Sequence, residues 1–271
     1  MTVYPNKQVL QSEDWPGLID THCHLDLEPL CHDLAGIVAN AHQAGVSCFV
    51  VPGVHPDGWE RLERVATEYE GVFPAFGIHP MHADRADDGT LSRLADLSSR
   101  GVAIGEIGLD PVYPVTMATQ ERAFRSQLRL AARMGLPVLV HCRRAFQRTL
   151  QILKEEGARQ AGGIMHAFSG SPEMAREFTR LGFAISISGM VTRENSVRLP
   201  RLVQELPLSE LVLETDAPDM TPQRYRGRPN QPAYLVETLH AVARIKGIDA
   251  IIAAEQFRAR SCAILSRMKV C

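Results

Sequence analysis

The sequence lacks several features that mark particular classes of protein. Its 6 cysteines among 271 residues form no C-x-x-C pair, and we expect a reducing, cytoplasmic location. A chain of this length can bury enough surface to need no disulfide staples. The first residues lack the apolar stretch of a signal peptide. No uncharged apolar run approaches the roughly 18 residues of a membrane span, and we therefore expect no membrane association.

An excess of one charge sign is also missing. The 29 Lys and Arg residues and 31 Asp and Glu residues leave a formal charge of −2, which argues against bulk electrostatic binding of nucleic acid but allows a local basic patch. A chain with 45% hydrophobic and 22% charged residues has a globular composition. We expect a single domain over residues 1–271, with no obligate protein partner.

Eight short apolar runs, rich in Val, Ile and Phe and bounded by Gly or Pro, are typical of buried strands. They cover residues 18–21, 47–51, 72–78, 102–107, 137–140, 163–165, 183–187 and 211–215. Helical patterns separate them, as in residues 120–134, where Phe124 and Leu128 recur at i and i+4. The alternation favours an α/β fold, a single (β/α)8 TIM barrel. A doubly wound open sheet also fits this periodicity.

Metal-ligand side chains follow five of these runs, and their position favours the barrel. His22 and His24 follow the first run, and alternation along a strand turns both to one side. Single residues end four other runs: Glu106, His141, His166 and Asp216. The carboxyl ends of parallel strands share one rim of a barrel, where barrel enzymes carry their sites. Each residue alone fits a polar strand cap, but five strand ends together predict a metal centre.

The number of ligands predicts more than one ion. Six ligands are too many for one tetrahedral ion and suit two divalent ions about 3.5–4 Å apart. Imidazoles mixed with carboxylates suit zinc, manganese or magnesium and do not choose among them. Glu106 is best placed to bridge the two ions. Asp216 is the candidate general base, because one oxygen can bind an ion while the other accepts a proton from water.

Six segments resemble, in order, the motifs of the TatD family of metal-dependent deoxyribonucleases in the amidohydrolase superfamily. They are I-D-T-H-C-H (19–24), G-I-H-P (77–80), G-E-I-G-L-D (105–110), L-P-V-L-V-H-C-R (136–143), H-A-F-S-G (166–170) and E-T-D-A-P (214–218). The resemblance implies a TIM barrel, divalent metals and hydrolysis of phosphodiester bonds in DNA. It also implies a ligand assignment: one ion on His22, His24 and Asp216, the other on His141 and His166, and Glu106 on both. Residues 111–114 and 260–265 depart from the family pattern.

Groups suited to an anionic substrate lie near the predicted ligands. Arg143 follows the fifth run, and Arg226 lies in the Pro- and Arg-rich segment 217–231. Guanidinium groups can bind phosphate oxygens through two hydrogen bonds. His79, in G-I-H-P, is expected to contact the substrate or its phosphate. The alternative for Arg143 and Arg226 is that they are solvated loop arginines, and the alternative for His79 is that it is a loop histidine with no substrate contact.

The leading interpretation is a phosphodiesterase acting on single-stranded or frayed DNA, because a near-neutral protein with a recessed site would bind duplex phosphates poorly. The alternative is an amidohydrolase-type enzyme that opens a small amide, lactone or ester with the same metals. Clustered arginines favour phosphate, whereas a tight apolar pocket over the metals would favour a small neutral molecule. A third interpretation, a binding protein that has lost catalysis, conflicts with the intact ligand set.

Overall fold

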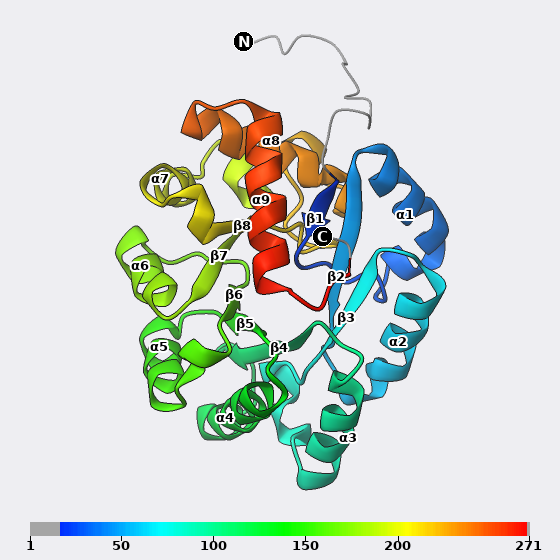
Figure 1. Ribbon diagram of the computed structural model, residues 1–271, viewed down its shortest axis with the longest axis vertical. Helices are drawn as coiled ribbons and strands as arrows, with labels where there is room; N and C mark the ends of the chain where they lie inside the picture. The colour runs from blue at the N-terminus through cyan, green and yellow to red at the C-terminus, as the bar shows by residue number, and fades with distance from the viewer. Residues whose placement is uncertain (1–16, 270–271) are drawn as a thin grey trace.

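Eight parallel strands, each paired with the next in chain order, form the centre of the computed structural model, which describes residues 17–269. The strands are β1 (Leu18–Asp20), β2 (Val46–Pro52), β3 (Val72–Phe76), β4 (Ala103–Leu109), β5 (Val138–Cys142), β6 (Gly163–Met165), β7 (Phe183–Ile187) and β8 (Leu211–Leu213). Helices surround the sheet (Figure 1). The arrangement confirms the eight predicted strands and the TIM barrel.

The last strand meets the first through individual hydrogen bonds. The backbone N–H and the hydroxyl of Thr21 both donate to the carbonyl of Leu213, at 3.1 and 2.9 Å. One step further on, the N–H of Asp216 donates to the carbonyl of His22 at 2.9 Å. These contacts nearly close the barrel and hold two predicted metal ligands side by side.

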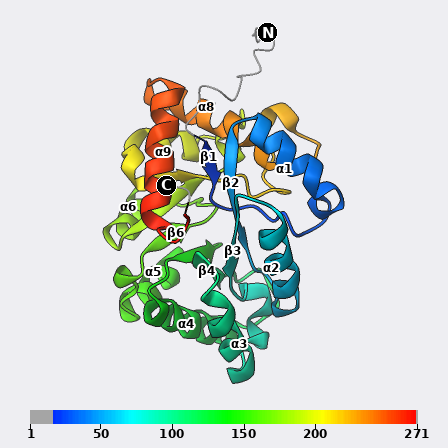
Figure 2. The same cartoon turned by 45° about the vertical axis from the view of Figure 1, so that its right-hand side comes forward.

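Nine helices cover the barrel in the part of the chain that the structure describes. They are α1 (Leu34–Gln43), α2 (Trp59–Glu68), α3 (Asp88–Ser98), α4 (Met117–Met134), α5 (Phe146–Glu155), α6 (Pro172–Arg180), α7 (Arg198–Glu205), α8 (Leu235–Lys246) and α9 (Ala250–Ile264). The helix α9 lies across one end of the barrel (Figures 1 and 2). Within residues 17–269, none of these helices combines the length and the apolar character that crossing a membrane requires.

Local sequence explains where the helices begin and end. The predicted helix at 120–134 is α4, and Gly135 ends it with a left-handed φ of 62°. Pro172 begins α6, and the hydroxyl of Ser171 accepts the N–H of Met174 at 3.3 Å as its cap. These signals fix how the loops leave the strand ends.

Alternate side chains of each strand belong to two separate apolar clusters. In β5, Val138 and Val140 pack in the outer cluster under the helices, whereas Leu139 belongs to a smaller inner cluster. The inner cluster also includes Leu265 and Met268, which follow α9. Because side chains alternate, His141 lies on the same side of β5 as Leu139. The polar residues therefore lie above the inner cluster, toward the carboxyl ends of the strands.

Two predicted ligands lie inside their strands, although they were expected to end them. The strand β4 continues to Leu109 and β5 to Cys142, because these two residues still pair with each other. Gly108 allows this close pairing: a Cβ on it would lie only 1.9 Å from the carbonyl oxygen of His141. Glu106 and His141 are consequently on the wall of the barrel and not on a loop.

Candidate metal centre

The six predicted ligands come together around the carboxylate of Glu106, which is 2% exposed. Its Oε2 lies 3.3 Å from Nε2 of His22 and 4.0 Å from Nε2 of His24. Its Oε1 lies 2.8 Å from Nδ1 of His141 and 3.8 Å from Nε2 of His166. The two oxygens of one carboxylate thus face different imidazoles.

Asp216, which follows β8, faces three of these four imidazoles. Its Oδ1 lies 3.6 Å from Nε2 of both His24 and His166, and 3.8 Å from Nε2 of His22. The residue has a φ of 55°, a left-handed conformation that is uncommon for a residue other than glycine. Such backbone conformations cluster at functional sites.

Three overlapping groups of side chains could each hold a metal ion. The groups, with ligand atoms within 4.8 Å of one another, are His22 with His166 and Asp216, His22 with His24 and Glu106, and His79 with Glu106 and His141. Within residues 17–269, His166 thus groups with His22 and Asp216 and not with His141, whose ring centre is 6.3 Å from that of His166. The assignment of ligands to individual ions stays a prediction.

Buried imidazole nitrogens fit a metal site. In the described part of the chain, Nδ1 and Nε2 of His22 and Nδ1 of His24 are buried without a hydrogen-bond partner. Leaving such atoms unpaired costs free energy, and a cation that accepts imidazole ligands would remove part of this cost. Burial, followed by the charge of His166, lowers the pKa of His22. A lower pKa favours the neutral ring that binds a metal.

Two carboxylates that the sequence analysis did not single out orient the histidines. Oε2 of Glu214 lies 3.0 Å from Nδ1 of His166, and its Oε1 accepts the N–H of Ala167 at 2.8 Å. Oδ2 of Asp110 lies 3.0 Å from Nε2 of His141. Carboxylates paired with ligand histidines fix the ring orientation and the tautomer. Both residues directly follow their strands, so the rule that found the ligands could have found them.

The carboxylates and imidazoles shift one another's pKa values. Burial alone would raise the pKa of Glu106, but the nearby rings, led by His79 and His22, outweigh it and hold this pKa well below its usual range. Burial opposes protonation of His141, yet the hydrogen bonds to Asp110 and Glu106 raise its pKa to about 8. The centre therefore keeps Glu106 ionised, as a metal ligand must be.

His79 lies closer to the centre than a pure substrate contact requires. Its Nε2 is 3.7 Å from Oε1 of Glu106, and burial lowers its pKa to about 3. The ring of Tyr113 stands edge-on to it, with ring centres 5.5 Å apart. His79 follows the third strand by three residues, so its position also obeys the strand-end rule. Its substrate-binding role stays a prediction.

The two predicted arginine contacts lie on loops at this rim. Arg143 is exposed, and its backbone N–H donates to the carbonyl of Leu109 at 3.1 Å, which places it beside the end of β4. Arg226 is exposed in the loop after β8, where Nδ2 of Asn230 donates to the carbonyl of Thr215 at 2.8 Å and anchors the loop. Both phosphate-binding roles stay predictions.

Comparison with known proteins agrees with this geometry. The family model described as TatD related DNase matches residues 19–266. The uncharacterized metal-dependent hydrolase YabD of Bacillus subtilis is 37% identical over 232 residues, which cover 84% of this chain and 91% of YabD. The human deoxyribonuclease TATDN3 is 33% identical over 248 residues, which cover 86% of this chain and 88% of that protein.

A solved structure extends the similarity to the whole fold. The crystal structure of YjjV, a TatD homologue from Escherichia coli, superposes with a TM-score of 0.86 at 31% identity. The superposition covers 91% of this chain and 97% of that one. The fold, the polar centre and the relatives agree: this chain belongs to the TatD family and is a metal-dependent hydrolase.

Proposed function

We propose that this hydrolase is a deoxyribonuclease that cleaves phosphodiester bonds of DNA at the centre around Glu106. The observation that carries the proposal is that Oε1 and Oε2 of Glu106 face different imidazoles, with His141 at 2.8 Å on one side and His22 at 3.3 Å on the other. A carboxylate in this position suits a bridge between two ions, and paired ions are typical of enzymes that cleave phosphodiesters.

The six ligands would hold two divalent ions, of zinc, manganese or magnesium. The first would be held by His22, His24 and Asp216 and the second by His141 and His166, with Glu106 shared. When bound, such ions supply Lewis acidity that activates water and neutralises charge on the phosphate. Glu214 keeps Nε2 of His166 turned to the centre, because it pairs with Nδ1 at 3.0 Å.

Asp216 would act as the general base. Its Oδ1 faces His24 and His166 at 3.6 Å, which leaves Oδ2 to accept the proton of the attacking water. Asp216 is only 8% exposed, so its carboxylate has little contact with bulk solvent. A general base positioned in this way contributes about 10²–10⁴-fold to the rate.

The substrate would be single-stranded DNA or a frayed end in the cytoplasm. Glu106 is 2% exposed, so the phosphate must enter a recessed site, which a flexible single strand does more easily than a duplex. Arg143 and Arg226 on the rim would bind phosphate oxygens, and His79 would contact the same phosphate from inside.

The test is hydrolysis of a short 3′-labelled single-stranded DNA with and without a chelator. We expect cleavage that the chelator stops and added divalent ions restore. Arg143→Ala should raise the KM for DNA and leave hydrolysis of an uncharged ester unchanged, while Arg133→Ala, in the last turn of α4 at the opposite end of the barrel, should alter neither. An uncharged ester or amide turned over faster than any nucleotide, with no effect of Arg143→Ala, would overturn the proposal in favour of the small-molecule alternative.

A further inference from the structure

A groove of about 650 Å³ lies beside the metal centre, between the loops that follow β5 and β6. Its lining includes Arg144, Phe146, Arg148, Ser171, Met174 and Arg198. Arg144 lies in the loop between β5 and α5, and the others come from α5, the start of α6 with its cap Ser171, and the first residue of α7. The metal-centre residues described above do not line it, so the groove is a separate feature of the same rim.

The groove carries positive charge and no carboxylate in its lining. Arg144 and Arg198 are exposed, and Nη1 of Arg198 donates to the carbonyl of Ser169 at 3.0 Å, which ties α7 to the loop after β6. Arg148 differs from them, because Glu121 binds its guanidinium and offsets its charge. Arg144 and Arg198 therefore remain to attract an anionic ligand.

Apolar side chains line the groove beside these arginines. Phe146 is half-buried and packs on Phe168, with ring centres 5.1 Å apart, and Met174 also lines the groove. A basic groove with an aromatic side chain in its lining has the two components by which proteins bind single-stranded nucleic acid, phosphate contacts and base stacking.

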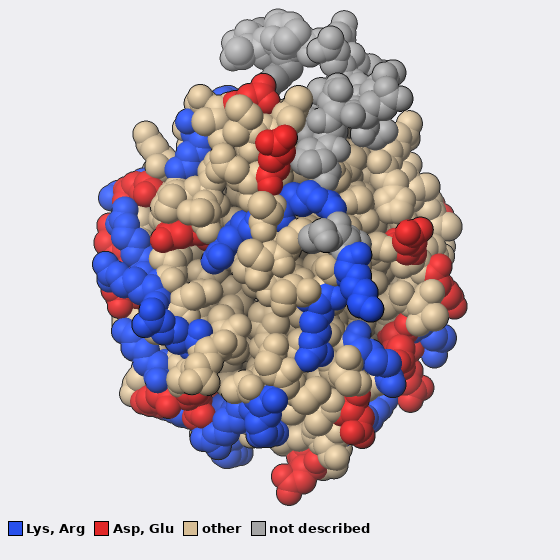
Figure 3. Space-filling view, in the orientation of Figure 1, with Lys and Arg blue, Asp and Glu red and all other residues tan. Residues whose placement is uncertain are grey.

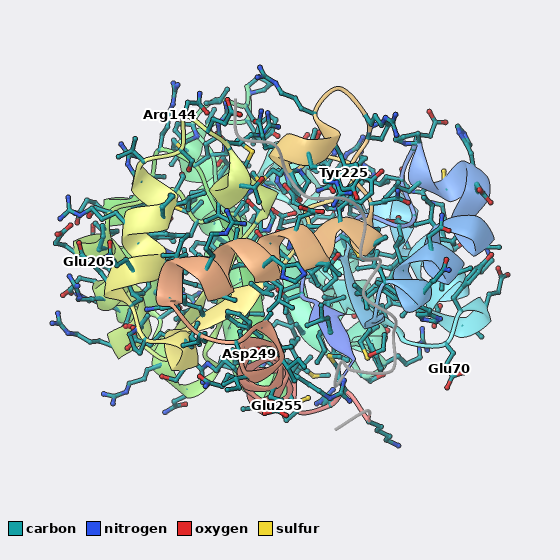
Figure 4. All side chains as sticks on the ribbon, turned by 90° about the horizontal axis from the view of Figure 1, so that it is seen from above. Glu70, Arg144, Glu205, Tyr225, Asp249 and Glu255 are labelled. Carbon is teal, nitrogen blue, oxygen red and sulfur yellow. The ribbon has the colours of Figure 1, made fainter. Side chains whose placement is uncertain are left out.

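The groove begins close to the metal centre. Arg144 is three residues after His141, a separation of at most about 11 Å along an extended chain. Gly170, which also lines the groove, is four residues after His166, or at most about 14 Å. Figure 4 shows Arg144 on the same edge of the molecule as Tyr225, from the loop after β8, and opposite Asp249 and Glu255.

Arg144 also has an unusual backbone conformation. Its φ is 53°, in the left-handed region that residues other than glycine seldom adopt. The fold thus holds an exposed arginine in a disfavoured conformation at the edge of this groove, as is common for residues of binding sites.

We propose that this groove binds the phosphates and bases of a single DNA strand next to the bond that is cleaved, an inference that rests on the function proposed above. The strand would leave the metal centre past His141 and His166. Arg144 and Arg198 would bind its phosphates, and a base would stack against Phe146.

The test is the salt dependence of binding, measured by fluorescence anisotropy with metal-loaded protein. The ligand is a labelled phosphorothioate oligothymidylate of about 12 nucleotides, chosen to resist cleavage. Arg144→Ala and Arg198→Ala should each weaken binding about three- to tenfold. Each should also reduce the slope of log K against log salt by about 0.7. Gln147→Lys, which adds a charge to the groove, should tighten binding, and Arg133→Ala should change nothing.

If both alanine variants had the same affinity and salt slope as Arg133→Ala, the proposal that the groove binds a DNA strand would be overturned. An equal dependence on Arg144 for a duplex would overturn the commitment to a single strand. Arg144→Ala should lower kcat/KM on a long strand and leave a dinucleotide unaffected. If the protein binds the strand through these arginines but cleaves no DNA, the proposed deoxyribonuclease function is wrong, while the proposal that the groove binds a DNA strand is upheld. If DNA is cleaved and Arg144→Ala behaves as Arg133→Ala, only the proposal that the groove binds the strand is wrong.

Discussion

The two ends of the barrel differ in what their side chains do. At the carboxyl end of the strands, buried imidazoles and carboxylates surround Glu106, and some of their nitrogens have no hydrogen-bond partner in the described part of the chain. At the amino end, the inner apolar cluster is sealed by Leu265 and Met268, which are 0% and 3% exposed. The same strands serve both ends, because Leu139 and His141 are two residues apart on β5.

This difference separates the residues that stabilise the fold from those that we propose perform the chemistry. The apolar end contributes burial free energy, whereas the polar end costs free energy until a cation binds. Exposed ion pairs such as Arg176 with Glu205, at 2.8 Å, join neighbouring outer helices, and charges of both signs are mixed along the edge of the face that carries α9 (Figure 3). Surface pairs of this kind contribute little, so the apolar end should govern stability.

The largest effect on activity is expected for Asp216→Asn. The amide can still offer an oxygen to an ion, but it cannot accept a proton, so kcat should fall about 10²–10⁴-fold. The melting temperature should change little. The kcat, the melting temperature and the metal content are measured on one preparation of the variant. A variant that binds metal normally and keeps more than about a tenth of wild-type kcat would remove Asp216 from the mechanism.

The complementary change at the other end is Leu265→Ala. Removing this fully buried side chain should lower the free energy of unfolding by about 2–5 kcal/mol, with kcat unchanged below the melting transition. Chemical denaturation measures the free energy of unfolding. The matched control is Ile252→Ala in α9, where the side chain is 49% exposed and a change within about 0.5 kcal/mol is expected. If Leu265→Ala lowered kcat without lowering stability, the division between the two ends would be wrong.

A smaller effect is expected for Glu214→Gln, which leaves every predicted ligand in place. The loss of the carboxylate that pairs with His166 should weaken metal affinity or activity about 10–100-fold. Metal affinity is measured by competition with a chelator. Glu237→Gln on α8 serves as control, because it disrupts only an ion pair with Arg224 in the loop after β8. Equal metal affinities in the two variants would show that Glu214 does not position His166.

The sequence predicted the barrel and the residues of its rim because both depend on simple periodicities. The shared direction of parallel strands placed His141, His166 and Asp216 at one end of the barrel. Alternation along a strand was the basis for grouping His22 with His24, but β1 ends at Asp20 and both histidines follow it. Their rings still lie together, with centres 5.1 Å apart. The shared direction of the strands can be inferred without knowledge of side-chain orientation, which explains why the position of the rim agrees with the structure.

The grouping of the ligands could not be predicted from spacing. It depends on ring orientations, which Glu214 and Asp110 fix from positions that are adjacent to the ligands only after folding. The length of β4 was also underestimated, because its pairing with β5 continues through Gly108, a residue that ordinarily weakens a strand. Glu106 itself lies where the register between β4 and β5 shifts, between Ile104 and Ile107, and local propensity does not predict such an irregularity.

The central claim is that the polar end of the barrel holds two metal ions through Glu106. Elemental analysis of the metal-reconstituted protein and of Glu106→Ala tests it most directly, with circular dichroism to show that both are folded. We predict up to two divalent ions per wild-type chain and a loss of both in Glu106→Ala, because the shared carboxylate holds the pair together. Less than half an ion per wild-type chain, or full two-ion occupancy with wild-type activity in Glu106→Ala, would contradict the account.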